Sequence, residues 1–342
     1  EMRESDWSSD VCSSDLASYF GIQTFTTGIY KAWLSMDNRL AAAQLATFLL
    51  ALVVLLLQLE LRAQRRMRFA TGGVGRAGSS EAQPTRLHGA YAVLAWLVCA
   101  LPVLMGFALP VLFMLRPLLA DWSLLPWDRF VQWAGNSVRL GAITAVLAVG
   151  IALALAFAVR RRRGPLMRAV VQLVSLGYAV PGAVIVVGLL LPVGWLQAAA
   201  PTWGLSALVT TTAVGIVWAY LVRFCAVALQ SVQSGYARVP ASLDDSARML
   251  GVGGMGLLMR VHWPLLKRST AAATLLVFVD VMKELPATIV LRPFDSDTLA
   301  VVAYQLARDE RLGEAALPSL ALVAVGLVPV ILLSRTLRGS SR

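Results

Sequence analysis

The sequence predicts an all-α membrane protein with about seven transmembrane helices. Of its 342 residues, 58% are hydrophobic and only 14% are charged, which is too apolar for a soluble domain of this length. Runs of about 20 mostly apolar residues, the length that crosses a bilayer core, recur along the chain. Basic residues gather between alternate runs. Together these three observations place the chain in a membrane.

The expected spans differ in how free of charge they are. Uncharged runs cover residues 90–115, 140–159 and 315–334, and the uncharged stretch 169–222 is long enough for two spans. Residues 40–59 and 269–291 supply two more, which include some polar side chains. The turn inside the long stretch is expected at a group of helix-breaking residues, namely Pro192, Gly194, Pro201 and Gly204.

The chain has a net charge of +11, and the distribution of its basic residues along the sequence indicates its orientation in the membrane. Nineteen of the 30 Lys and Arg residues lie in segments 62–86, 160–168, 238–268 and 335–342, whereas the opposite loops hold six. The positive-inside rule makes the first set cytoplasmic, so the amino terminus is expected in the periplasm and the carboxyl terminus in the cytoplasm. A nucleic-acid partner is not expected, because the basic residues follow the membrane topology.

Few residues are suited to metal binding or to disulfides. Cys12, Cys99 and Cys225 have no paired spacing, and the last two fall in apolar segments. The two histidines, His88 and His262, are expected at cytoplasmic edges. No metal site and no bound cofactor are predicted.

The first 16 residues are expected to be artefactual. Residues 6–16 read DWSSDVCSSDL, which has no apolar period and no signal-peptide character. The same peptide is the translation, in one frame, of DNA that resembles a common sequencing adapter. The biological sequence is then expected to begin near Ala17, and the alternative is a genuine disordered tail.

The two ends of the chain resemble each other, which suggests a tandem duplication. Residues 17–61 would be the end of a first repeat with one transmembrane helix, and residues 87–342 a complete second repeat of six helices. Between them, residues 62–86 are basic and rich in Gly and Ser, as in a flexible cytoplasmic linker suited to anionic lipid headgroups. The alternative is chance similarity between Ala- and Leu-rich helices. The matching residues are Thr24, Tyr30, Arg39, Leu40, Ala43 and Leu45 with Thr298, Tyr304, Arg311, Leu312, Ala315 and Leu317.

Residues 241–264 form the most informative cytoplasmic segment. They are too polar to span a membrane, yet their apolar residues recur at helical spacing. Gly251, Gly253 and Gly254 predict a bend between two short helices. Such a unit beneath a membrane offers a surface to a soluble partner, and an ordinary amphipathic surface loop is the alternative.

This segment resembles the loop of binding-protein-dependent ABC importer permeases, which reads Glu-Ala-Ala, three residues, Gly, nine residues, Ile, one residue, Leu-Pro. Ala247, Gly251 and Pro264 match outright. The departures are Asp245, Ser246, Val261 and Trp263. The resemblance implies that this loop docks on a separate ABC ATPase and transmits its closure to the spans.

Two interruptions of the expected spans are candidates for the passage or its gate. Asp280, Lys283 and Glu284 lie within an apolar segment, where ionisable residues are costly and usually face the bundle interior. Their spacing also allows a self-neutralising structural cluster. The other interruption contains Pro181 and Gly182, where a kink and a close helix approach are expected.

The strings KELPATIVLRPFDSDTLAV, YQLARDERLGEAALP and TFTTGIYKAW resemble ferric iron permeases of ABC importers. This resemblance implies the type I importer permease fold, Fe(III) as cargo and a periplasmic substrate-binding protein. It also implies a partner repeat, either the missing first repeat or a second permease copy. Permeases for thiamine, sulfate, polyamines or phosphonates share the loop and remain the alternative.

The remaining function classes fit the sequence less well. No Walker A sequence is present, so ATP would be used by the partner subunit. No nucleophile paired with a base was found, which predicts a non-catalytic transport subunit. A secondary transporter would explain the hydropathy but gives no reason for the loop spacing.

Overall fold

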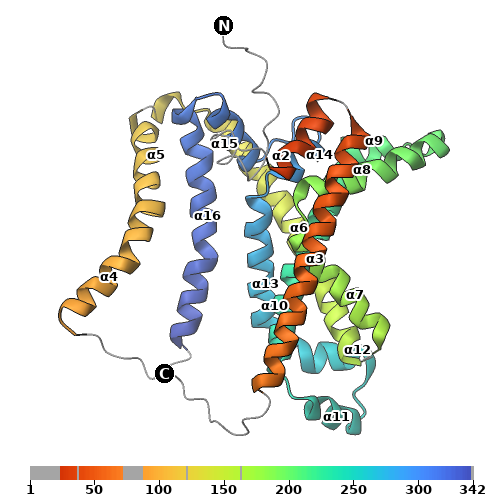
Figure 1. Cartoon of the computed structure of the whole chain (residues 1–342). Coiled ribbons are helices and arrows are strands. Elements are labelled where there is room, and N and C mark those ends of the chain that lie inside the picture. Colours follow the sequence, from red (N-terminus) through yellow and green to blue (C-terminus); the bar gives the residue numbers. More distant parts are fainter. Residues whose placement is uncertain (1–23, 37, 72–87, 121, 162–163, 340–342) are drawn as a thin grey trace.

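The computed structural model describes residues 24–36, 38–71, 88–120, 122–161 and 164–339. These residues form helices and connecting turns without a strand (Figure 1). The segment expected to be artefactual, residues 1–16, lies outside the described residues. So does 72–86, the larger part of the expected linker, whereas its first part continues the helix α3 to Thr71.

The long helices run alternately in opposite directions across the molecule (Figure 1). They are α3 (Arg39–Thr71), α4 (Ala90–Val103) continued by η2 (Leu104–Ala108) and α5 (Leu109–Ala120), α6 (Trp127–Arg161), α8 (Gly182–Ala199), α10 (Ala213–Tyr236), α13 (Trp263–Met282) and α16 (Leu312–Gly339). Shorter helices connect them: α2 (Phe25–Tyr30), η1 (Lys31–Ser35), η3 (Trp122–Leu124), α7 (Pro165–Leu176), η4 (Gly177–Ala179), η5 (Pro201–Trp203), α9 (Leu205–Thr211), α11 (Ala241–Met249), α12 (Gly254–Gly256), η6 (Leu257–His262), α14 (Pro286–Leu291) and α15 (Leu299–Arg308).

Six helical stretches of the described chain are long and apolar enough to cross a membrane. They confirm six of the predicted spans and make the chain a multi-pass membrane protein. They are Leu40–Leu59, Ala90–Ala120, Trp127–Arg161, Gly182–Ala199, Ala213–Tyr236 and Leu312–Leu332.

The prediction was wrong in two details of the spans. Pro192 lies inside α8, as does Gly194, so the turn comes later, at residues 200–204. Pro192 stays helical because a membrane helix retains most of its backbone bonds around one proline. The span expected at residues 269–291 is divided between α13 and α14, and α13 does not join the six because it includes Lys267, Arg268 and Asp280.

The core lies where α6, α10 and α13 pack together. Small side chains allow these helix axes to approach closely, as is usual between membrane helices. Ala148 and Ala152 of α6, Ala228 of α10 and Ala273 of α13 are completely buried there. These three helices therefore form the rigid body that positions the loops at both ends.

The segments aligned as repeats also share local structure. Thr24 is the N-cap of α2 and Thr298 the N-cap of α15, with nearly the same extended backbone angles. Each short helix is followed by a long one, α3 or α16. The duplication stays a prediction, but the aligned threonines perform the same capping role.

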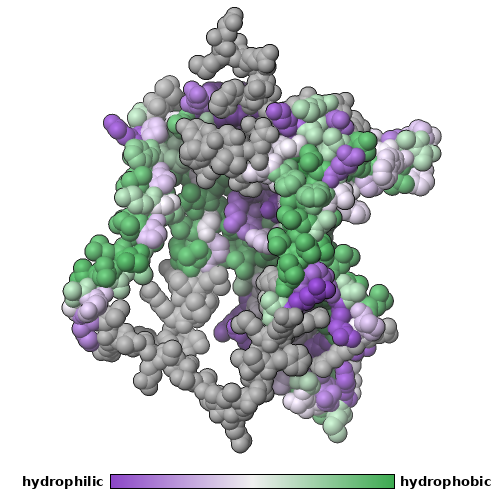
Figure 2. Space-filling view, in the orientation of Figure 1, coloured by the Kyte–Doolittle hydropathy of each residue, from purple (hydrophilic) through white to green (hydrophobic). Residues whose placement is uncertain are grey.

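Apolar surface covers the outer helices of the molecule. Figure 2 shows it as green along α3 and along α4 and α5. None of the residues of α4 is buried, and this helix lies apart from the core in Figure 1. Such a surface suits contact with lipid or with another membrane helix.

Candidate functional site

The segment 241–264 forms a helical knob at one end of the bundle, shown at the bottom of Figure 1. The helix α11 ends where Gly251 adopts a left-handed backbone with φ of 79°, and the Val252 N–H donates to the Ala247 carbonyl. Gly254 has a second positive φ, and the chain then continues through α12 and η6 into α13. The predicted bend between two helical pieces is confirmed.

The motif residues divide between the two faces of this knob. Ala247 is buried with Phe157 of α6 and Leu257 of η6. Asp245 and Ser246 are exposed, as are Trp263 and Pro264, whereas Val261 is half-buried. Large apolar side chains stand on the outer face, with Met249 90% and Leu250 83% exposed. The knob therefore presents apolar surface away from the membrane helices.

Arg160, near the end of α6, holds the inner face of the knob. Its Nε lies 2.6 Å from Asp244 Oδ2 and its Nη2 lies 3.0 Å from Asp244 Oδ1, a bidentate pair. The same guanidinium donates to the carbonyls of Val239 and Pro240, each at 3.0 Å, and to that of Tyr236 at 3.5 Å. One side chain thus joins α6 to the end of α10 and the start of α11.

His262 completes this network from the other side. Its side chain is completely buried, with Nε2 3.0 Å from Asp244 Oδ1 and Nδ1 3.2 Å from the Tyr236 hydroxyl. A neutral ring that donates through Nε2 and accepts through Nδ1 satisfies both contacts. His262 was expected at an edge of the membrane. The structure places it at the end of the bundle, buried within this network and not on the surface.

Asp244 is held in its charged form. Burial works against the charge, but the hydrogen bonds from Arg160 and His262 outweigh it, so the pKa of this carboxyl lies below its ordinary value. Asp244 also lies in the first turn of α11, where the helix dipole favours a negative charge. The Arg160–Asp244 pair therefore persists throughout the neutral pH range.

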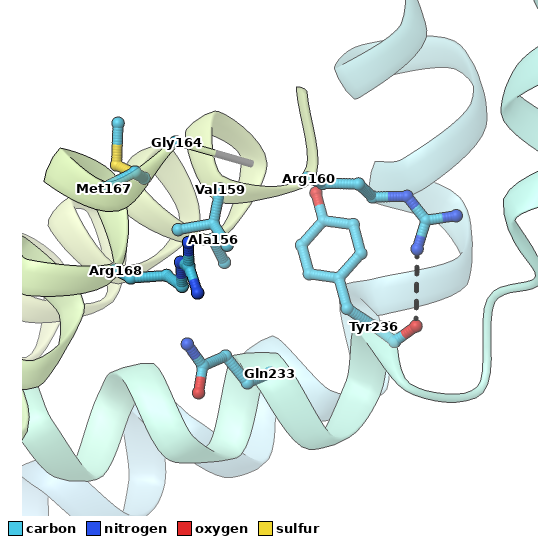
Figure 3. Close-up of a pocket in the computed structure, with 8 residues that line it drawn as sticks. All are labelled: Ala156, Val159, Arg160, Gly164, Met167, Arg168, Gln233 and Tyr236. Carbon is cyan, nitrogen blue, oxygen red and sulfur yellow. Dashed lines mark hydrogen bonds between the residues drawn. The ribbon is translucent and has the colours of Figure 1, made fainter. Parts of the chain in front are cut away.

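A cavity of about 460 Å³ opens beside this network, between α6, α7 and α10 (Figure 3). Figure 3 shows Arg168 and Gln233 directed into the space, whereas the guanidinium of Arg160 points away to the Tyr236 carbonyl. The lining residues are Ala156, Val159, Arg160, Gly164, Met167, Arg168, Gln233 and Tyr236.

The two predicted interruptions meet inside the bundle. The first lies between α7 and α8, where Pro181 is the N-cap and Gly182 the first residue of α8. The second lies between α13 and α14, where Pro286 begins the new helix. A β-carbon on Gly182 would lie 2.9 Å from Cβ of Pro286 and 3.2 Å from Oε1 of Glu284. Glycine is therefore required for this close approach.

Of the self-neutralising cluster that the spacing allowed, only the Asp280–Lys283 contact is present, and Glu284 pairs elsewhere. Glu284 pairs with Nη1 of Arg223 on α10 at 2.8 Å. Its carboxylate also accepts from the backbone N–H groups of Ala287 and Thr288, so it caps α14. The Thr288 hydroxyl lies 2.5 Å from that of Tyr220. The break after α13 turns Glu284 towards α10, which helical spacing alone did not anticipate.

Asp280 and Lys283 form a separate pair at 3.0 Å. The Lys283 side chain is 63% exposed, in contrast to the buried Glu284. The charges at residues 280–284 therefore belong to two separate pairs, one buried and one partly exposed.

Sequence reasoning missed the partners that complete both networks. Arg223 ends the uncharged stretch 169–222 and was assigned to no role, although an arginine in a membrane helix is itself a signal of an interior partner. Asp244 stands beside the motif residue Asp245, and nothing in the sequence distinguishes which carboxylate turns inward. No group of three or more His, Cys, Asp or Glu side chains suited to a metal was found in the described ranges.

Comparison with known proteins supports the predicted resemblance. No protein-family model matches the chain. The Fe(3+)-transport system permease protein FbpB 2 of Haemophilus influenzae is 25% identical over 324 residues, covering 93% of this chain. The chain spans 61% of that relative's length.

A solved structure gives the fold. A chain in the crystal structure of a bacterial alginate ABC transporter, in complex with an alginate pentasaccharide-bound periplasmic protein, superposes with a TM-score of 0.55 at 13% identity. The superposition covers 71% of this chain and 92% of that one. The predicted resemblance to ferric iron permeases of ABC importers is confirmed in sequence, and the fold is that of an ABC transporter permease.

Proposed function

We propose that the chain is a transmembrane permease subunit of an ABC importer in the bacterial inner membrane. It would provide the passage for ferric iron delivered by a periplasmic binding protein and driven by a separate ATPase. The knob formed by residues 241–264 is the observation that supports this most directly. A rigid helical unit with exposed apolar side chains at the end of a membrane bundle is suited to docking a soluble partner.

The mechanism follows from how the knob is attached. ATP binding closes the ATPase subunits and draws their docked knobs together. Because Arg160 joins the inner face of the knob to α6 and to the end of α10, the movement reaches the core helices. The passage then opens towards the periplasm, and hydrolysis returns it to the inward-open state. The chain itself binds no cofactor in this scheme, and ATP is used by the partner.

The cytoplasmic side is assigned from the basic segments and the knob. Arg160 and Arg161 end α6 at the same end of the bundle as α11, which contains Arg248. Arg292 follows α14 and Arg308 ends α15, and both helices lie at the other end (Figure 1). With the knob in the cytoplasm, the described chain begins in the periplasm and ends in the cytoplasm.

Ferric iron as cargo is supported by the relative's described role as an Fe(3+)-transport system permease. Permeases for thiamine, sulfate, polyamines or phosphonates are the alternative. Uptake of radioactive Fe(III) from a loaded binding protein tests the cargo, with thiamine, sulfate, a polyamine and a phosphonate as competing probes. Uptake of one of those solutes without iron uptake would contradict the iron assignment and leave the permease assignment intact.

Recovery of an ATPase tests the permease assignment itself. The tagged full-length permease should recover an ABC ATPase from detergent-solubilised membranes. Leu250→Asp should lower that recovery at least tenfold, on the order of a lost interface hot spot. Leu312→Asp is the matched control, because Leu312 is also exposed but begins α16 at the opposite end. No ATPase with the unmodified protein, or equal recovery with both variants, would contradict the proposal.

A further inference from the structure

Arg160 occupies a position where three helices end or begin. It lies one residue before the end of α6, and its partners are the last residue of α10, the connection after it and the first turn of α11. All three nitrogens of its guanidinium have partners within hydrogen-bond distance. A planar guanidinium fixes direction as well as charge, because its donors form a rigid fork.

The backbone alone does not fix α11 against α6. On one side α11 is joined to α10 through residues 237–240, which end at Pro240, and on the other it is joined to η6 through Gly251 and Gly253. The apolar contact of Phe157 with Ala247 and Leu257, against which Val252, Leu258 and Val261 also pack, has no directional bonds. The hydrogen bonds that fix the start of α11 to α6 therefore come from Arg160, and His262 holds the same Asp244 carboxylate from the other side.

We propose that Arg160 is the positioning residue that makes the coupling knob and α6 move as one body, so that closure of the ATPase is transmitted to the core through Asp244. This inference rests on the proposed function. The force reaches α6 through two parallel hydrogen bonds at 2.6 and 3.0 Å, and His262 holds the other side of the same carboxylate. Without Arg160, α11 changes its orientation by rotation of the backbone near Pro240 and Gly251, and α6 does not move with it.

The test measures uptake and ATP hydrolysis together in the complete importer, reconstituted with its ATPase and binding protein. Arg160→Gln should lower the number of solute molecules taken up per ATP at least tenfold while the ATPase still co-purifies. Arg160→Lys should fall between Arg160→Gln and the unmodified protein, because it keeps the charge without the fork. Arg161→Gln is the matched control. Arg161 is the next residue of α6, its side chain is exposed, and its contact is with the Phe157 ring of its own helix.

A distance measurement tests the same inference without the partner. Spin labels at the exposed positions Ser242 of α11 and Leu147 of α6, placed after the native cysteines are replaced, report the distance between these two helices. Arg160→Gln should broaden that distance distribution, and Arg161→Gln should leave it unchanged. The double variant Arg160→Gln with Asp244→Asn should lower the number of solute molecules taken up per ATP no further than Arg160→Gln alone does. This is the result expected when two residues act as one pair.

The outcomes separate this inference from the function on which it rests. An unmodified importer that recovers no ATPase contradicts the proposed function. A coupled unmodified importer whose Arg160→Gln variant keeps its uptake-to-ATP ratio and a narrow distance distribution contradicts the positioning role. A lower yield of folded complex for Arg160→Gln, with an unchanged uptake-to-ATP ratio in the complexes that do fold, also contradicts the positioning role. That result would assign Arg160 to stability alone.

Discussion

Two arginine–carboxylate pairs, one at the knob and one inside the bundle, join helices that are distant in sequence, and they are built differently. Arg160 and Asp244 join the coupling knob to α6, and Arg223 and Glu284 join α10 to the start of α14. Arg160 uses all its nitrogens, and its partner accepts from His262 as well. Arg223 donates to Glu284 through Nη1, whereas its buried Nε has no hydrogen-bond partner in the described structure.

The two pairs differ in how completely the arginine is hydrogen-bonded. A fully satisfied network resists rearrangement, because each group that leaves it loses a hydrogen bond in a buried environment. An arginine with an unused buried donor has already lost part of that energy. In the Arg223–Glu284 pair the carboxylate is the fully bonded member, because it also accepts from the backbone N–H groups of Ala287 and Thr288. Substitutions in the two pairs and in the residues around them should therefore lower stability or uptake by different amounts.

The largest effect is expected for Glu284→Gln. Removing one member of a buried ion pair leaves the other charge uncompensated and costs about 3 kcal/mol or more in the free energy of unfolding. Thermal unfolding of the detergent-purified protein measures this loss. The double variant Arg223→Gln with Glu284→Gln should lose less than the sum of the two single variants, because no lone charge remains.

The same substitution tests Glu284 as a gate residue. In reconstituted vesicles, Glu284→Gln should reduce the uptake rate measured per folded importer. Normal protein level with unchanged uptake would rule out a gate role for this carboxyl group and leave it as the cap of α14.

A smaller loss is expected for Gly182→Ala. Its β-carbon would lie 2.9 Å from Cβ of Pro286 and 3.1 Å from Nη1 of Arg223, so α8 must shift or the ion pair must open. Overpacking of this kind costs about 1–3 kcal/mol in stability. Gly188→Ala is the control, since it lies in the same helix with nothing within 4 Å of an added β-carbon. Equal melting temperatures for both variants would contradict the close approach.

Gly251 tests the knob through its backbone. An added β-carbon meets nothing within 4 Å, so the cost comes from the positive φ of 79° and amounts to about 1–2 kcal/mol for an ordinary residue. Gly251→Val should lower uptake per ATP, whereas Gly251→Asn should retain most of it, because Asn tolerates the left-handed region. Similar loss in both variants would mean that side-chain size at the ATPase surface, and not backbone conformation, decides coupling.

The sequence predicted what depends on local pattern and missed what depends on contacts between distant residues. The bend at Gly251 and the helix break at Pro181 and Gly182 were predictable, because glycine and proline act on their own segment of backbone. The choice of Asp244 over Asp245 as the partner of Arg160 depends on how α11 lies against α6. A pairing across 84 positions leaves no trace in the spacing of nearby residues.

The smallest effect on stability is expected for Asp280→Asn. Its partner Lys283 has a side chain 63% exposed, and ion pairs with an exposed member contribute about 0–1 kcal/mol. The melting temperature should therefore stay close to that of the unmodified protein. Uptake is the discriminating measurement, because a carboxylate that lines the passage acts on the permeating solute whatever its contribution to stability. Reduced uptake at an unchanged melting temperature would assign the Asp280–Lys283 pair to the passage. Unchanged uptake would show that the carboxylate of this exposed pair has no part in transport.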